Sequence, residues 1–264
     1  MSIGSGSSGN CYYLGTEKEG IIIDSGIPLR TIAKSLKYEG IEFSNKHIKG
    51  IIVTHDHADH VRSVGILAHS VKLPIYSTHK VSVSIMHSRF IREDLSGFIT
   101  KVEYEKPFII GNFVITPFFI PHDSSDNVGY LIEIENVRFV LATDIGHVTE
   151  TIKNYTKKAT HLVVESNYDK EMLLNGDYPD YLKDRVSGPM GHISNDECAT
   201  LLASCYHQDM KDIWLCHLSK ENNHPELCWK TIEFRLFNEG IRVGKDVSLT
   251  VLKRTTPSPL YILN

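Results

Sequence analysis

The sequence predicts a layered α/β fold. Short apolar runs that resemble strands alternate with longer amphipathic segments, and several of these runs end in a polar or ligand-type residue. Alternation of this kind is typical of sheets covered by helices. No linker or internal repeat divides the 264 residues, so we expect a single domain over residues 1–264.

Individual elements follow from composition and periodicity. Strands are predicted where β-branched and aromatic residues gather, at residues 20–24, 50–54, 113–116, 128–134, 138–144, 161–166 and 212–217. Helices are predicted where apolar residues recur at helical spacing, at residues 28–38, 59–70, 80–90, 194–207 and 225–240. One of these helices carries a capping box, Ser194 with Glu197. Residues 254–264 contain two prolines, and we expect them to be loosely structured.

Composition excludes some classes of protein. A formal net charge of −4 argues against a surface that binds nucleic acid over its whole extent, although it allows a local basic groove. The five cysteines form no C-x-x-C motif, which favours reduced thiols over a disulfide framework. There is no signal-type N-terminus and no apolar run of the roughly 18 residues that a membrane span needs. We therefore expect a cytoplasmic protein without a membrane or stable protein partner.

The stretch "IIVTHDHADH", residues 51–60, crowds metal-ligand side chains behind a buried strand. His55 and His57 are two positions apart in a turn, and Asp59 and His60 follow as a helix begins near Ala58. Placing three imidazoles and two acids there without partners would be costly. Four ligands from one loop can hardly all reach one tetrahedral ion, which favours two metals.

These residues resemble the H-x-H-x-D-H signature of the metallo-β-lactamase superfamily of dinuclear metallohydrolases. Its other motifs are matched by Asp24 in "IIIDSG", by His122, by Asp144 in "FVLATDIG" and by His217. The resemblance implies two divalent ions, zinc or manganese, and a buried supporting role for Asp24. It assigns the ligands as follows: His55, His57, His122 and Asp144 on the first metal, and Asp59, His60, Asp144 and His217 on the second.

Two later stretches resemble the phosphodiesterase branch of the superfamily, known from the transfer-RNA 3'-processing endonucleases. They are "LVVESNYD" with Glu165 and "GPMGHISNDECA" with His192. The resemblance implies that His192 is the general acid, that Glu165 orients its ring and raises its pKa, and that Asp59 acts both on the metal and in the proton relay. From the residues alone, Glu165 could equally end a strand and His192 could equally lie in an uninvolved loop.

Over nearly its full length, the chain resembles the YycJ (WalJ) subgroup of this superfamily, which is regarded as DNA exonucleases. The opening "IGSGSSGNCYYL" and the stretch "HLSKENN" carry the likeness. Candidate substrate-binding residues are Ser7, Ser8 and Asn10 in the first, and Ser219 and Lys220 in the second. A flexible cap and a solvated turn are the alternatives. Relatives carry a few more residues before this opening, which leaves room for a start upstream of Met1.

The predicted architecture is a four-layer αββα sandwich with the metal site at one edge of the sheets. The predicted function is that of a dinuclear phosphodiesterase, a nuclease resembling a 5'-3' exonuclease that acts on DNA rather than RNA through a metal-bound hydroxide. Strand contacts are expected near Lys183, Arg185 and Lys220. The main alternative is a hydrolase of a cyclic nucleotide, lactone or thioester on the same fold, and a second is a non-catalytic binding protein.

Overall fold

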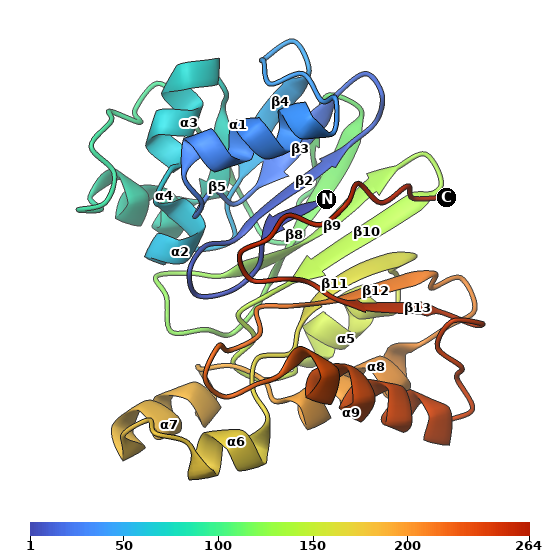
Figure 1. Ribbon diagram of the computed structural model, residues 1–264. Helices are drawn as coiled ribbons and strands as arrows, with labels where there is room; N and C mark the ends of the chain where they lie inside the picture. Colours follow the sequence, from blue (N-terminus) through green and yellow to red (C-terminus); the bar gives the residue numbers. More distant parts are fainter. The chain divides into compact units, whose positions relative to one another are not determined.

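Two β-sheets with their helices make up the structure, a computed structural model that describes residues 1–264 (Figure 1). The chain divides into two units. Unit 1 comprises Met1–Pro117, Ser124–Val128 and Lys253–Ile262, and unit 2 comprises Phe118–Asp123, Gly129–Leu252 and Leu263–Asn264. The mixed α/β content matches the prediction, while the single domain over residues 1–264 stays a prediction.

The first sheet lies in unit 1 and has six strands in sequence order. They are β1 (Ser2–Gly4), β2 (Cys11–Gly15), β3 (Gly20–Ile23), β4 (Ile48–Ile52), β5 (Ile75–Thr78) and β6 (Ile99–Val102). The first three pair antiparallel, and β3 to β6 pair parallel. Parallel strands end at a common edge, so the chain leaving β3 and the chain leaving β4 start there together.

Helices connect the parallel strands of this sheet (Figure 1). They are α1 (Leu29–Tyr38), α2 (Ala58–Val61), α3 (Val64–Val71) and α4 (His79–Met86). The apolar face predicted for the second helical segment is confirmed, because all five of its residues are buried, namely Val61, Val64, Leu67, Ala68 and Val71. This face packs with β3 and β4 in one core.

The prediction of one continuous helix over residues 59–70 is wrong, because the segment is broken between α2 and α3. The physical reason lies in two carbonyl groups of the first turn. The carbonyl of Asp59 accepts the backbone N–H of Asn10, and the carbonyl of His60 accepts that of Ser25. The N–H of Ser63 in turn bonds to the carbonyl of Ser25. These long-range bonds replace the helical ladder at this point.

The second sheet has seven strands in the order β13-β12-β11-β10-β9-β8-β7. They are β7 (Phe108–Ile110), β8 (Phe113–Phe119), β9 (Val128–Ile134), β10 (Val137–Ala142), β11 (His161–Glu165), β12 (Asp212–Cys216) and β13 (Ser248–Val251). The strands β10 to β13 are parallel, with Ala142 opposite Val164 and Glu165 opposite Cys216. The ends of β10, β11 and β12 therefore share an edge.

Five helices belong to unit 2 (Figure 1). They are α5 (Glu150–Thr156), α6 (Lys170–Asn175), α7 (Asp180–Ser187), α8 (Asn195–Cys205) and α9 (Pro225–Asn238). The predicted capping box is confirmed at the start of α8. The helices α5, α6 and α7 were not predicted, because they are short and α7 buries no residue that would mark a periodic apolar face.

All five cysteines are buried, and none is in a disulfide. Burial raises the pKa of Cys228 to about 12, so this thiol stays protonated and unreactive at neutral pH. None of the helices combines the length and apolar character that crossing a bilayer requires.

Candidate metal centre

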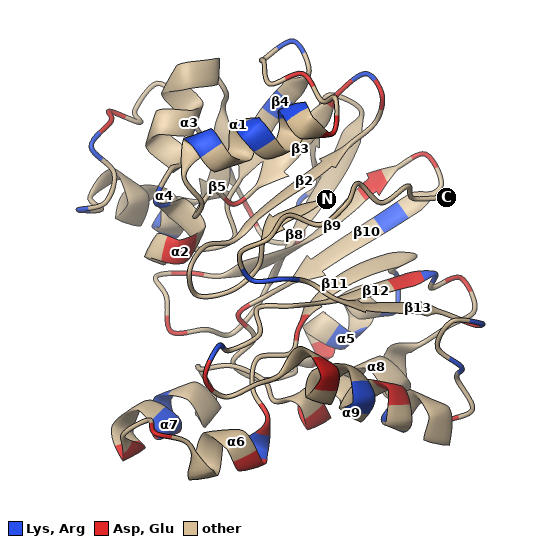
Figure 2. Cartoon of the chain, in the orientation of Figure 1, with Lys and Arg blue, Asp and Glu red and all other residues tan.

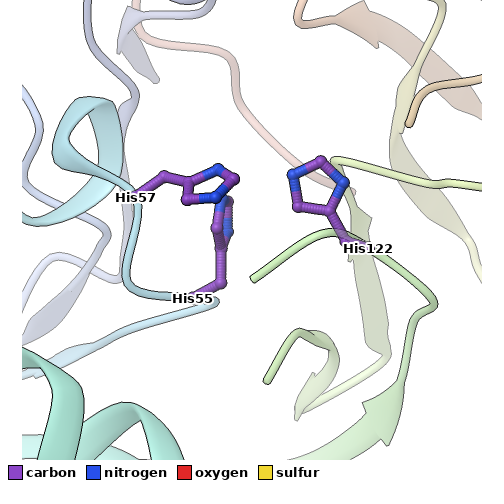
Figure 3. A group of neighbouring side chains, drawn as sticks. All are labelled: His55, His57 and His122. Carbon is purple, nitrogen blue, oxygen red and sulfur yellow. The ribbon is translucent and has the colours of Figure 1, made fainter. Parts of the chain in front are cut away.

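The motif loop of unit 1 follows β4 and leads into α2. His55 is fully buried, while His57 is half-buried. Their rings leave the same loop and meet edge to face, with 4.8 Å between centroids (Figure 3). The ring of His60 lies 4.0 Å from that of His55. The turn and the start of α2 thus bring three imidazoles of this motif together, as the spacing predicts.

The Asp24 side chain holds this loop from the end of β3. It is fully buried, and its Oδ2 accepts a hydrogen bond of 2.7 Å from Nδ1 of His60. The backbone N–H and the hydroxyl of Thr54 each donate to the same carboxylate at 2.8 Å. Because that hydroxyl donates to Asp24, it accepts from Nδ1 of His55 at 3.0 Å. The buried Asp24 carboxylate therefore has the supporting position that was predicted for it. It orients the imidazole of His60 directly and that of His55 through the Thr54 hydroxyl.

Asn10 supports the motif from the loop before β2. Its side chain is fully buried, and its amide nitrogen lies 2.9 Å from Nε2 of His60 and 3.2 Å from Oδ2 of Asp59. Its amide oxygen accepts the backbone N–H of Gly6. The structure therefore places this candidate substrate residue among the ligands, whereas Ser7 and Ser8 are exposed in the same loop.

Gly26 is a positioning residue that the sequence analysis missed. A Cβ at this position would lie 1.6 Å from the carbonyl oxygen of Asp59 and 2.9 Å from the backbone nitrogen of His60. Only glycine lets the chain after Asp24 pass this close to the peptide that joins two motif residues. Its presence directly after Asp24 and Ser25 in "IIIDSG" was the sequence signal that could have identified this close approach.

We expect Gly26→Ala to lower the free energy of unfolding by about 1–3 kcal/mol, because the added methyl must push the Asp59–His60 peptide away. Metal content should fall with it. Thermal unfolding and metal analysis of the purified variant test this. Gly97→Ala is the matched control, since a Cβ there meets nothing within 4 Å. Equal stability of the two variants would contradict the prediction.

His122 lies on the loop after β8, in unit 2, and Figure 3 labels its ring. Its Nδ1 donates to the carbonyl of Gly191 at 3.0 Å. A Cβ at Gly191 would lie 2.2 Å from the carbonyl oxygen of Arg185. Arg185 itself donates through Nε to Asp123 at 2.6 Å. The segment that ends α7 therefore fixes the orientation of His122.

Asp144 follows β10 and is buried. Its Oδ2 accepts the hydroxyl of Thr143 at 2.7 Å, and its Oδ1 lies 3.5 Å from Nε2 of His217 and 3.7 Å from Nε2 of His122. Its backbone is left-handed, with φ of 54°. Such a conformation is strained for a residue other than glycine and is held by its surroundings. One carboxylate oxygen is thereby presented to two imidazoles.

Glu165 ends β11 and holds two histidines. Its Oε1 accepts from Nδ1 of His192 at 2.8 Å and from Nδ1 of His217 at 3.1 Å. Its Oε2 accepts the backbone N–H groups of Ile145 and Ile193. Burial alone would raise the pKa of this carboxyl, but the charge of His192 and the hydrogen bonds from both imidazoles outweigh burial and hold the pKa below its ordinary value. A charged Glu165 therefore orients both rings.

The stretch after β12 serves the fold as well as the site. Asn167 donates through its amide to the carbonyl of His217 at 2.8 Å. The amide of Asn223 donates to the carbonyls of Ser166 and Asn167, so it is used inside the protein. Of the two candidate substrate residues here, Ser219 is half-buried, and its hydroxyl accepts the backbone N–H of Asn222.

Lys220, the second of these candidates, is exposed, with its side-chain ammonium 3.1 Å from Glu221. Lys183 is half-buried, and its ammonium donates to the carbonyl of Leu174. Both lysines already have a polar neighbour in the chain.

The donor chemistry fits a divalent metal. In unit 2, ligand atoms of Asp144, Glu165, His192 and His217 all lie within 4.8 Å of one another. The Nδ1 atoms of His55, His60, His122 and His217 are each hydrogen-bonded to a hydroxyl, carboxylate or carbonyl, which makes Nε2 the ligand atom, although Nε2 of His60 also contacts the Asn10 amide. Metal-ligating histidines are held in this way. Asn167 and Gly191, which provide part of this support, were missed because their partners are 50 and 69 residues away. Thr54 adjoins His55 but was missed because its own anchor, Asp24, is 30 residues away.

Comparison with known proteins agrees with this geometry. The family model for the beta-lactamase superfamily domain matches residues 21–215, most of the chain. The chain belongs to the beta-lactamase superfamily. This superfamily member resembles Exodeoxyribonuclease YycJ of Bacillus anthracis, with 32% identity over 92% of this chain and 90% of that protein. It also resembles Exodeoxyribonuclease WalJ of Streptococcus pneumoniae, with 31% identity over 98% of this chain and 95% of that protein. The resemblance to the YycJ/WalJ subgroup is confirmed.

Solved structures confirm the fold of this superfamily member. Zn²⁺-bound PqqB from Methylobacterium extorquens superposes with a TM-score of 0.70 at 14% identity, covering 96% of this chain and 97% of that one. The metallo-β-lactamase fold protein YhfI from Bacillus subtilis superposes with a TM-score of 0.69 at 16% identity, covering 96% and 95%. The predicted metallo-β-lactamase fold is confirmed, and the chain is an enzyme of this hydrolase family. Its His and Asp groups indicate that it uses a divalent metal.

Proposed function

We propose that the protein is a metal-dependent phosphodiesterase of the nuclease type that removes nucleotides stepwise from DNA, in the 5'-3' direction. The observation that carries this proposal is the Glu165–His192 pair beside Asp144. Expulsion of a sugar oxygen benefits from a positioned proton donor of this kind, whereas the thiolate of a thioester leaves without one. Two exodeoxyribonucleases that match nine-tenths or more of this chain and of their own length support DNA as substrate.

For the metals, we propose two divalent ions, zinc or manganese. The ligands would be His55, His57, His122 and Asp144 for one ion, and Asp59, His60, Asp144 and His217 for the other. Support comes from the orientation of the imidazoles in each unit and from the imidazole and carboxylate donors, which suit these metals. Bound there, the ions would activate water and neutralise charge on the phosphoryl oxygens.

The chain's own residues would move the proton. Nδ1 of His192 is held by Glu165, so Nε2 is the atom that can donate to the leaving sugar oxygen. The His192 side chain is 19% exposed, which gives a substrate access to it, while Glu165 is fully buried and can act only through the ring. Asp59 would bind metal beside Asn10 and His60, and the resemblance to the phosphodiesterase branch gives it a part in this relay as well.

The proposal is tested with a single-stranded DNA oligonucleotide labelled separately at each end and incubated with the purified protein in manganese or zinc. Stepwise release of nucleotides from the 5' end is expected. Absence of digestion by metal-loaded protein, together with hydrolysis of a cyclic nucleotide, lactone or thioester, would overturn it. Location in the cytoplasm stays a prediction.

A further inference from the structure

Charge is distributed unequally between the two units. Unit 1 contains 15 Lys and Arg against 12 Asp and Glu, a net charge of +3, whereas unit 2 contains 13 against 20, a net charge of −7. Within unit 1, residues 60–92 contain no Asp or Glu, although the whole chain has 32. This segment starts at the last histidine of the metal motif and carries five cations, namely Arg62, Lys72, Lys80, Arg89 and Arg92. A locally basic surface therefore exists in an acidic protein.

The end of this segment presents apolar and cationic side chains together. On α4 and just after it, Val83, Met86 and Phe90 are 40%, 44% and 45% exposed. Lys80 and Arg89 are exposed on the same stretch, and the guanidinium of Arg89 lies 5.0 Å from the centre of the Phe90 ring. Figure 2 shows Lys and Arg on α4 and on the loop that follows it. Helical spacing places positions 79, 83 and 86 of α4 on one face, and Phe90 follows in the turn after the helix.

A cavity of about 350 Å³ opens on this face. Its lining is His79, Lys80, Val83, Ser84 and Ser125. The cavity is tied to the metal motif through Asp56, which lies between His55 and His57 in sequence. The Asp56 carboxylate accepts the hydroxyl of Ser84 and, at 3.1 Å, the backbone N–H of Ser125.

We propose that the α4 face, defined as Lys80, Val83, Met86, Arg89 and Phe90 with the adjoining cavity, binds the DNA strand that the site cleaves. This inference rests on the proposed nuclease function. A single strand is recognised by cations that follow its phosphates and by aromatic or apolar surfaces on which its bases stack. Phe90 and Val83 supply the second kind of surface, and Lys80 and Arg89 the first.

Nearby carboxylates keep their charge, but the hydrogen bonds that they accept come from hydroxyls and backbone N–H groups and not from these cations. Asp126 accepts hydrogen bonds from the hydroxyls of Thr78 and Tyr104, and Asp94 accepts the backbone N–H of Ser96. Glu93 accepts the backbone N–H of Arg92. The cations of the α4 face thus have no Asp or Glu as hydrogen-bonded partner among the contacts of this stretch, which favours an anionic strand over an apolar protein partner.

The test is a binding titration of a fluorescently labelled, phosphorothioate-protected single-stranded oligonucleotide, followed by anisotropy at several salt concentrations. Lys80→Glu with Arg89→Glu should raise the Kd at least about tenfold. The slope of log K against log salt should become shallower by about 1.4, the value for two phosphate contacts on a single strand. Phe90→Ala should raise the Kd about tenfold through loss of one stacked base.

The control is Lys18→Glu with Lys46→Glu, which makes the same change in net charge. Both residues are exposed and precede β3 and β4, at the opposite ends of these strands from the metal motif. Unchanged strand affinity in the Lys80 and Arg89 variant, or an equal loss in the control, would overturn the inference. Hydrolysis of bis(4-nitrophenyl) phosphate is measured in parallel, and the rates of all these variants should stay within about twofold of the wild-type rate. A metal-loaded wild type that does not hydrolyse this ester would instead count against the proposed function.

Discussion

Asp144→Ala is expected to abolish metal binding and DNA hydrolysis together. The buried carboxylate presents Oδ1 to Nε2 of both His122 and His217, and Thr143 holds its other oxygen. Glu165 cannot take its place between these rings, because it already holds two Nδ1 atoms. We expect activity to fall at least about a thousandfold, since both metals would lose a shared ligand. Metal analysis after dialysis and oligonucleotide digestion measure the two effects.

A matched control removes a carboxylate that touches none of these groups. Asp209 is 78% exposed and lies 3.9 Å from Arg138, so Asp209→Ala should keep both metal and activity. An Asp144→Ala protein that retains its full metal content would refute the bridging role. A variant that keeps its metal but loses activity would mean that Asp144 acts in the reaction without being a metal ligand.

His192→Ala should lower the rate of DNA hydrolysis by about 10²–10⁴ and leave the metals bound. The ring is hydrogen-bonded to Glu165 and is not among the proposed ligands, so its removal takes away a proton donor and leaves the metal ligands in place. Bis(4-nitrophenyl) phosphate should be hydrolysed with less than about a tenfold loss, because nitrophenolate leaves without a proton. The ratio of the two losses is the diagnostic quantity.

His147 provides the control for this variant. It is exposed and donates through Nδ1 to the carbonyl of Pro189, in the loop that precedes His192. His147→Ala should change neither rate. Equal losses on DNA and on the nitrophenyl ester in His192→Ala would mean that His192 supports the structure instead of donating a proton.

Much of this arrangement could be predicted because it is local in the chain. The strands that end at residues 23, 52, 142, 165 and 216 are apolar runs, and each is followed or closed by a ligand-type residue. Within each sheet, parallel strands end at one edge, so the side chains that follow those strands gather at that edge whatever the rest of the sequence is. The two-residue spacing of His55 and His57 likewise needs only the turn that contains them.

Other features could not be predicted from local patterns. The break between α2 and α3 arises because two carbonyls of the first turn bond to Asn10 and Ser25, which are far away in sequence. Left-handed backbone at Asp24, Asp144 and His217, with φ of 54–56°, is unfavourable for these residues in isolation and persists only where the surroundings enforce it. The α4 face depends on exposure, which a sequence does not report.

The sequence by itself determined the strands that are followed or closed by ligand-type residues, the ligand types and, within each sheet, the edge at which they gather, since each follows from spacing along one strand or turn. Tertiary structure decided which nitrogen each histidine presents. His60 is oriented by Asp24, 36 residues away, His217 by Glu165, 52 residues away, and His122 by Gly191, 69 residues away. Hydrogen bonds of 2.7–3.1 Å between such distant residues exist only once the chain has folded, so the orientation of the imidazoles is a property of the fold.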